Sequence, residues 1–334
     1  MHQANSPQPN STTIASRIGP VFAFTWDENS ARGTKSDNFP RPDQAYRFTW
    51  VHADRTAEVA QDWIKSHPAI PDAARHALLE TDTRPRVDSF NDGLLVILRA
   101  VELTEGADPD ELISLRMWLD AERLITLRSK RVMAPSQLRD RLDEGLVAQS
   151  PAALMVTLTT LITDNLAELI EDLGEAIGEL EEASLGDDLL EKRELVAQHQ
   201  RRIIAFRRHI TPQVHALGRL RAEAPLLHEH STALRELENR SQRILEELTH
   251  LAERGHLLKT EVSEAHTRKA DDRMRLLTVL GALFLPLSFL TGLLGINVGG
   301  IPGADEGLAF WIVCGAMFGL FVLQLLWLRW RGWI

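Results

Sequence analysis

Two long apolar stretches without a charged residue lie near the C-terminal end of this chain, and they constrain its fold more than any other feature. They occupy residues 276–295 and 308–328. At about 1.5 Å per residue, roughly 20 helical residues cross the ~30 Å hydrocarbon layer of a bilayer. The sequence therefore predicts two transmembrane helices, joined by a loop over residues 296–307 and followed by a tail over residues 329–334.

The charges that flank the apolar stretches predict their orientation in the membrane. The basic residues before the first stretch and after the second are Arg268, Lys269, Arg273, Arg275, Arg329 and Arg331. The loop between the stretches has no Lys or Arg and holds the acidic pair Asp305 and Glu306. Because cytosolic loops carry the excess of Lys and Arg, both termini are expected in the cytosol and the loop outside.

The composition of the 334-residue chain excludes several classes of protein. A net charge of −10 argues against a nucleic-acid partner, because affinity for nucleic acid depends on basic surface. The single cysteine, Cys314, lies within the second apolar stretch, so neither an intrachain disulfide nor a thiolate metal cluster is expected. No phosphate-binding loop, nucleophile elbow or HExxH spacing points to an enzyme, and no cofactor is expected.

The first half of the chain predicts a compact cytosolic α/β domain over residues 20–150. Residues 1–19 precede it and are rich in Ser, Asn, Gln and Pro, so they are expected to be disordered. The domain mixes alternating strand patterns with amphipathic helix patterns. Strands are expected at residues 21–26, 47–52, 93–101, 112–119 and 123–128, and helices at residues 56–66, 71–80 and 135–144.

Residues 151–275 predict a helical hairpin and a stalk. Helices are expected at residues 152–183 and 188–222, with a turn at residues 185–188. Pro212 should kink or interrupt the second helix, because proline cannot donate a helical hydrogen bond. A third helix is expected from Ser231, a good N-cap residue, to Gly295. At about 65 residues and roughly 98 Å it needs lateral partners, which self-association would supply.

One face of the first apolar stretch combines small, polar and apolar side chains. Steps of three or four residues place on that face Met274, Leu277, Gly281, Leu285, Ser288 and Gly292. Two helices per chain cannot enclose a water path, so a conducting form would be an oligomer lined by this face. The alternative is a seam of small residues at which helices pack. The spacing alone leaves both interpretations open.

The loop end of the first stretch is expected to attract cations. Pro286 frees one backbone carbonyl, and Gly295 is expected to end the helix in the left-handed conformation. The negative end of the helix dipole would then face the outside, where Asp305 and Glu306 add negative charge. Asn297 follows the helix end and can turn its amide oxygen toward a hydrated ion.

The same segment resembles the CorA superfamily of divalent-cation transporters. The residues that carry this likeness are 274–278, 284–292 and the tripeptide Gly295-Ile296-Asn297. The most familiar members have Gly-Met-Asn at the tripeptide. The isoleucine and the following residues 298–303 are instead similar to the ZntB zinc-transporter branch, as are residues 83–87 and the hairpin around residues 117–128.

The resemblance implies a funnel-shaped homopentamer in a bacterial inner membrane. Its fold class would be an α+β cytosolic domain with αβα layers, a long helical stalk and two C-terminal transmembrane helices. By this likeness Asn297 forms an outer selectivity ring, with Gly295 and Ile296 beside it, and the face described above lines the pore. Members of the ZntB branch are taken to import zinc coupled to protons. The expected partners are therefore membrane lipid, further copies of the chain, divalent cations and protons.

The chemistry of the expected pore lining does not select one ion. Between Asp272 and Asn297 there is no His, Cys, Asp or Glu, so an ion would pass largely hydrated. Zinc favours imidazole and thiolate ligands, whereas magnesium keeps its water and prefers oxygen. Zn²⁺ is expected from the resemblance alone, and Mg²⁺, Co²⁺, Ni²⁺ and Cd²⁺ stay open. Because neither stretch holds a titratable carboxylate or imidazole, proton coupling would use flanking groups or water.

Four residues outside the apolar stretches are candidates for binding metal. His228 and His230 form a His-X-His pair, and Glu264 and Asp271 precede the first stretch. In each case solvated side chains are the alternative. Two other functions are alternatives to zinc uptake: a magnesium or cobalt channel of the same superfamily, and a membrane-anchored coiled-coil scaffold.

Overall fold

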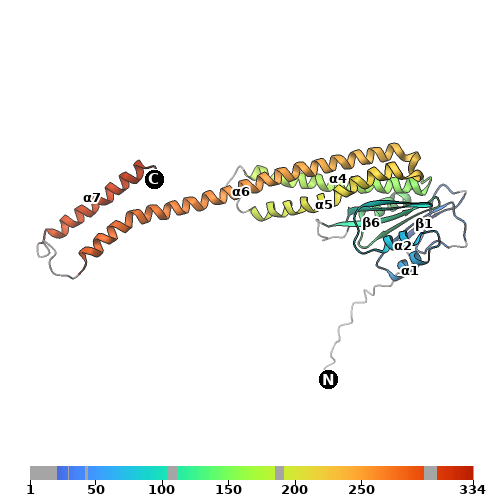
Figure 1. Ribbon diagram of the computed structural model, residues 1–334, viewed down its shortest axis with the longest axis horizontal. Coiled ribbons are helices and arrows are strands. Elements are labelled where there is room, and N and C mark those ends of the chain that lie inside the picture. Colours follow the sequence, from blue (N-terminus) through green and yellow to red (C-terminus); the bar gives the residue numbers. More distant parts are fainter. Residues whose placement is uncertain are drawn as a thin grey trace, which may run out of the picture. The chain divides into compact units, whose positions relative to one another are not determined.

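The computed structural model describes residues 21–28, 30–41, 44–103, 111–184, 192–296 and 307–333 (Figure 1). The chain divides into two compact units. The first unit consists of Met1–Ala183 and Glu194–Leu257, and the second of Ser184–Arg193 and Leu258–Ile334. Two of the expected features, the disordered residues 1–19 and the turn at residues 185–188, lie outside the described residues.

The first unit is built around one seven-stranded mixed sheet. Its strand order is β2-β1-β3-β7-β6-β5-β4. β3 and β7 are parallel, and the other neighbours are antiparallel. The strands are β1 (Phe22–Trp26), β2 (Thr34–Ser36), β3 (Phe48–Asp54), β4 (Arg86–Phe90), β5 (Gly93–Val101), β6 (Leu112–Leu119) and β7 (Arg123–Arg128).

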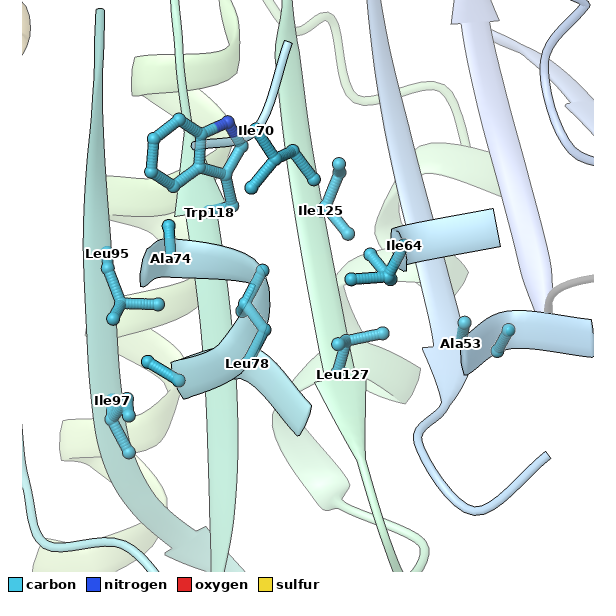
Figure 2. Packing of buried hydrophobic residues seen from close by; sticks show 12 residues of the cluster. Ala53, Ile64, Ile70, Ala74, Leu78, Leu95, Ile97, Trp118, Ile125 and Leu127 are labelled. Atoms are coloured by element: carbon cyan, nitrogen blue, oxygen red, sulfur yellow. The ribbon is translucent and has the colours of Figure 1, made fainter. Parts of the chain in front are cut away.

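The central strands β5 and β6 are nearly continuous apolar runs, buried over most of their length. Such a run is expected when helices cover both faces of a sheet. One cover consists of α1 (Glu58–Ser66) and α2 (Asp72–Leu79). Ile64 and Leu78 from these helices pack against sheet residues that include Leu95, Trp118 and Ile125 (Figure 2).

The other helices of the first unit are α3 (Met133–Asp143), α4 (Pro151–Ser184), α5 (Arg193–Glu223) and the first part of α6 (Ser231–Leu294). Figure 1 shows α4, α5 and α6 running side by side. Polar contacts join them: Arg254 of α6 donates to Glu181 of α4, and Gln200 of α5 donates to the Gly255 carbonyl at 2.7 Å. The amides of Gln137 in α3 and Asn165 in α4 exchange hydrogen bonds.

Most of the expected elements are confirmed, and three strands match their predicted bounds without change: β5, β6 and β7. Two strands, β2 and β4, were not predicted. Pro212 was expected to kink or interrupt its helix; an interruption is wrong, since α5 continues through Pro212, and a kink stays a prediction. Buried neighbours on both sides, Ile210 and Gln213 among them, hold this turn of the helix in place.

The second unit contains the end of α6 and α7 (Ala309–Trp330). α7 ends in a Schellman arrangement, in which the Trp333 N–H donates to the Leu328 carbonyl at 3.0 Å and Gly332 to Arg329 at 3.1 Å. Gly332 has φ of +72°, a left-handed conformation that glycine adopts without the steric cost of a side chain. This glycine therefore sets the end of the helix.

Candidate ion-conducting face

Among the described residues, three helical segments are long and apolar enough to cross a membrane, judged by length and composition. They differ in how much of their most apolar window the chain itself buries. The segment Pro151–Glu182, in α4, has 56% of that window buried. The segments that end at Leu294 and Trp330 have 6% and 0% buried. Only these two segments leave nearly all of their apolar side chains uncovered by the chain itself.

Within the second unit, α6 is continuous up to Leu294, with Pro286 inside the helix. The Gly295 N–H donates to the Thr291 carbonyl at 2.9 Å, which completes an ordinary helical turn. The expected left-handed conformation of Gly295 is wrong, because its φ lies outside that region. A Cβ on this glycine would lie 3.1 Å from the Thr291 carbonyl oxygen, so a larger residue would be crowded there.

The six residues of the predicted pore face are all exposed within the chain. These are Met274, Leu277, Gly281, Leu285, Ser288 and Gly292. Met274, Leu277 and Leu285 have 65%, 63% and 71% of their surface exposed. A Cβ added at Gly281 or Gly292 would meet nothing within 4 Å. The chain leaves this face of α6 without a packing partner of its own.

The residues of this α6 segment that are not exposed form a separate stripe. Between residues 271 and 296 they are Val279, Leu283, Pro286, Leu287 and Leu290. At about 100° per residue, the centre of this stripe lies roughly 170° around the helix from the centre of the predicted pore face. The covered residues are therefore centred on the side of the helix opposite the predicted pore face, while most other positions around the helix are exposed.

α7 carries a matching stripe of covered residues at intervals of three or four. They are Ala309, Val313, Met317, Leu320, Phe321, Gln324 and Leu328. Leu328 is 2% exposed, the lowest value in α7, and Leu283 is 8% exposed, the lowest value between residues 271 and 296 of α6. We infer that α7 covers the side of α6 that faces away from the predicted pore.

Arg275 joins the start of the first predicted span to the residues that follow the second. Its Nε donates to the Trp333 carbonyl at 3.1 Å, and its NH2 group donates to the Gly332 carbonyl. These carbonyls follow the C-terminal end of α7, where a cation also complements the helix dipole. From the sequence, Arg275 was expected only as a flanking charge. The glycine near the end of the chain was a signal for the turn that presents these carbonyls.

The candidate metal ligands do not come together within the chain. His228 and His230 lie in a 3-10 helix (Pro225–His230) of the first unit, and His228 is exposed. Glu264 and Asp271 are exposed residues of α6 in the second unit. Within the described ranges, no group of three or more His, Cys, Asp or Glu is arranged to hold a metal ion.

After α6 the structure describes two residues before the undescribed part of the predicted loop. Gly295 and Ile296 follow α6, and Ile296 is 50% exposed. Asn297, Asp305 and Glu306 lie outside the described residues, so their proposed roles rest on the sequence.

An α/β unit with a helical bundle, together with two apolar helices whose side chains the chain leaves uncovered, defines a class: membrane proteins with a large extramembranous part. The model of a protein family described as "CorA-like Mg2+ transporter protein" matches residues 46–330. The chain therefore belongs to the CorA family of divalent-cation transporters.

Relatives place it in the branch that includes ZntB and CmaX. It is 36% identical over 284 residues to the divalent cation transporter CmaX of Pseudomonas aeruginosa, covering 82% of this chain and 84% of that protein. It is 32% identical over 291 residues to the zinc transport protein ZntB of Pectobacterium carotovorum subsp. carotovorum, covering 85% and 88%. The resemblance to the CorA superfamily and its ZntB-like branch is confirmed.

Solved structures agree at the level of the fold. The full-length CmaX structure matches with a TM-score of 0.76 at 30% identity, covering 95% of this chain and 98% of that one. The CorA magnesium transporter of Methanocaldococcus jannaschii matches with a TM-score of 0.77 at 19% identity, covering 93% and 98%. At that identity the likeness concerns the fold alone.

Proposed function

We propose that this chain is the subunit of a homopentameric zinc importer of the bacterial inner membrane, with both termini in the cytosol. Residues 20–150 form the cytosolic α/β domain and residues 151–275 the helical bundle and stalk. Residues 276–295 and 308–328 span the membrane, with the outer loop at residues 296–307 and the cytosolic tail at residues 329–334. The number five rests on the family resemblance.

The observation that carries the proposal is the uncovered face of α6. Its six residues are exposed, whereas the stripe roughly 170° away is covered. A helix that turns small and polar groups away from its own hairpin partner is suited to surround an axis with its copies. A packing seam against α7 is disfavoured, because the stripe that α7 covers lies on the opposite side of α6, while a packing seam with another helix stays the alternative.

The uncovered face continues toward the cytosol as Ser263, Thr267 and Ala270, all exposed. At about 100° per residue these positions lie within roughly 40° of the centre of the pore face. Asp271 and Glu264 flank this extension and would steer cations into its entrance. Because these positions hold hydroxyl and carboxylate oxygens, the ion is expected to enter hydrated.

The choice of zinc is supported by the relatives named ZntB, while the family description names Mg2+. A direct measurement is zinc and magnesium uptake by the purified full-length protein in liposomes, with and without a pH gradient. Zinc uptake that accelerates when protons flow inward is the expected result. Uptake of magnesium alone would make the protein a magnesium channel, and uptake of neither ion would leave the scaffold function.

The selectivity role of Asn297 has its own test. We expect Asn297→Ala to lower zinc uptake at least about tenfold, because a lost hydrogen bond to a charged group is worth about 1.5–3 kcal/mol. Cys314→Ala, at an exposed position of α7, is the matched control and should transport normally. Native mass spectrometry should give the same pentamer for both variants. Normal uptake by Asn297→Ala would remove this residue from the filter.

A further inference from the structure

A cavity of about 530 Å³ lies where strand β4 stops short of its neighbour. β4 pairs only with Gly93–Ile97 of β5, so the last residues of β5 have no strand on that side. Helix α5 takes its place: the Arg99 backbone N–H donates to the Gln213 Oε1 at 2.6 Å. The cavity lies between the turn that precedes β4, the end of β5 and α5, all within the first unit.

The lining of this cavity is strongly basic. Its charged and titratable residues are Asp82, Arg84, Arg99, Arg207, Arg208, His209 and His215. The lining therefore holds four arginines and one carboxylate. Other arginines of the same unit have acidic partners; Arg221 binds Glu238 at 2.7 Å and Arg254 binds Glu181. Among the described residues, no ion-pair partner is seen for Arg84, Arg207 or Arg208.

Arg99 is held in place by the backbone around it. Its NH1 group donates to the Leu112 carbonyl at 2.9 Å and its NH2 group to the Thr83 carbonyl at 2.8 Å. Its Nε is buried and has no hydrogen-bond partner within the described part of the chain. A guanidinium fixed in this way is already oriented. Binding of a ligand would therefore cost little side-chain entropy of Arg99.

Arg116, which is not a lining residue, adds positive charge behind the cavity wall. Arg116 is 2% exposed, and its NH2 group lies 3.4 Å from the Oγ1 of Thr83, a lining residue. Burial, with the nearby charges of Arg55 and Arg99, lowers the pKa of Arg116 to about 10. Burial, followed by the charges of Arg99 and Arg208, also lowers the pKa of His209. The nearby carboxylates of Glu80, Asp82 and Glu111 oppose part of this positive charge, which comes from five arginines.

We propose that this cavity binds a small molecule that carries two or more linked phosphate groups. Arginine forks match phosphate oxygens in pairs, and charge-assisted bonds of this kind are the strong ones. The volume lies in the range of about 300–1,000 Å³ that is usual for small-molecule sites. The chemistry fits both inorganic polyphosphate and the phosphate chain of a nucleotide. The site lies in the α/β unit and does not depend on the ion that the membrane helices carry.

The test uses the full-length protein in detergent, without divalent metal, titrated with sodium tripolyphosphate or ATP by calorimetry. The double variant Arg207→Gln/Arg208→Gln removes two exposed lining charges. The matched control, Arg201→Gln/Arg243→Gln, removes the same charge from residues paired outside the cavity with Glu194 and Glu236. We expect the cavity variant to weaken tripolyphosphate binding at least about tenfold and the control to stay within about threefold.

Further comparisons show which part of the ligand is recognised and which results would overturn the proposal. Equal affinity for tripolyphosphate and ATP would mean that the cavity recognises the phosphates alone. Tighter binding of ATP would mean that it also recognises the nucleoside. Absence of phosphate binding, or equal weakening in both double variants, would overturn the proposal. So would a cavity variant that changes the oligomer mass but not phosphate binding, because the cavity would then receive an acidic segment of a second copy. Zinc uptake, measured separately, should persist in the cavity variant.

Discussion

Tryptophan shows how differently the two units of this chain meet their surroundings. In the first unit Trp26, Trp50 and Trp118 are completely buried. In the second unit Trp311 and Trp330 are 71% and 81% exposed. The same large apolar side chain is thus enclosed by the chain in one unit and left open in the other.

The difference shows which contacts each unit can supply for itself. The α/β unit covers both faces of its sheet with its own helices, so its stability is a property of the single chain. The apolar helices of the second unit cover only one stripe of each other, and exposed apolar surface of this extent marks a membrane or protein contact. A membrane or another protein surface must cover the rest. The following predictions test that contrast, beginning with the largest expected effect.

Removing a buried tryptophan should destabilise the protein far more than removing an exposed one. Trp118 is completely buried, and its Nε1 donates to Asp120 at 3.0 Å. We expect Trp118→Ala to cost about 3–5 kcal/mol, which lowers Tm by roughly 6–20 °C. Trp330→Ala should change Tm of the α/β unit by less than a few degrees. Thermal unfolding of the full chain in detergent measures both, and similar losses would contradict the contrast.

Filling the uncovered face of α6 should block transport without unfolding the chain. Gly281 has open space around it within the chain, and so does Gly315 of α7. If copies of α6 surround the pore, Gly281→Leu should lower zinc uptake about tenfold, because a bulky apolar side chain narrows the water path. Gly315→Leu is the matched control and should keep most of the uptake. An inactive Gly315 variant beside an active Gly281 variant would reverse the assignment of the faces.

Acid should destabilise the first unit through two histidines. Burial, then the charges of Arg128 and Arg139, lowers the pKa of His52 well below 6.5. The pKa of His67 falls to about 4, for which burial is again the first cause. Both stay neutral in the folded state, while the unfolded chain protonates them below about pH 6.5. Stability should therefore fall as pH drops from about 6.5 toward 4.

Melting curves between pH 7.5 and pH 4.5 in steps of about half a pH unit would measure this loss. His67→Asn should reduce the loss, because Asn takes up no proton in the unfolded chain. The control is His250→Asn, at a side chain that is 70% exposed in α6. A pH dependence that is the same in both variants would mean that His67 does not contribute.

The smallest effect is expected at the outer loop. Asp305 and Glu306 should steer ions rather than bind them, and at about 0.15 M salt their field reaches about 8 Å. Replacing them with Asn and Gln should slow uptake a few-fold at low ionic strength and little at high salt. The order of preference among divalent ions should stay the same. A changed order would make the loop part of the filter.

The parts of the fold that the sequence predicted best are those with long apolar patterns. β5 and β6 are buried over most of their length, so their apolar runs set their bounds. β2 has three residues at an edge and no apolar pattern, and β4 is an edge strand of mixed polarity. Edge pairing of this kind depends on a partner strand that a local pattern does not record.

The candidate pore face was named from helical periodicity and stays a prediction. The spacing of small and polar residues named one face of α6, and the covered stripe lies on the other side of the helix. The same pattern could not identify Arg275 as a link to α7, because the acceptors are backbone carbonyls some 57 residues away. Nor could it show the basic cavity, whose arginines come from the turn before β4, the end of β5 and α5.

The sheet of the first unit ends in strands of three and five residues, β2 and β4, although its inner strands β5 and β6 have nine and eight. Exposed strand edges can recruit strands from other polypeptides, and short edges limit this. Where β5 extends beyond β4, the backbone N–H of Arg99 already donates a hydrogen bond to the Gln213 side chain. We therefore expect a newly synthesised α/β unit to resist edge-to-edge aggregation while the apolar helices, which follow it in the chain, await insertion.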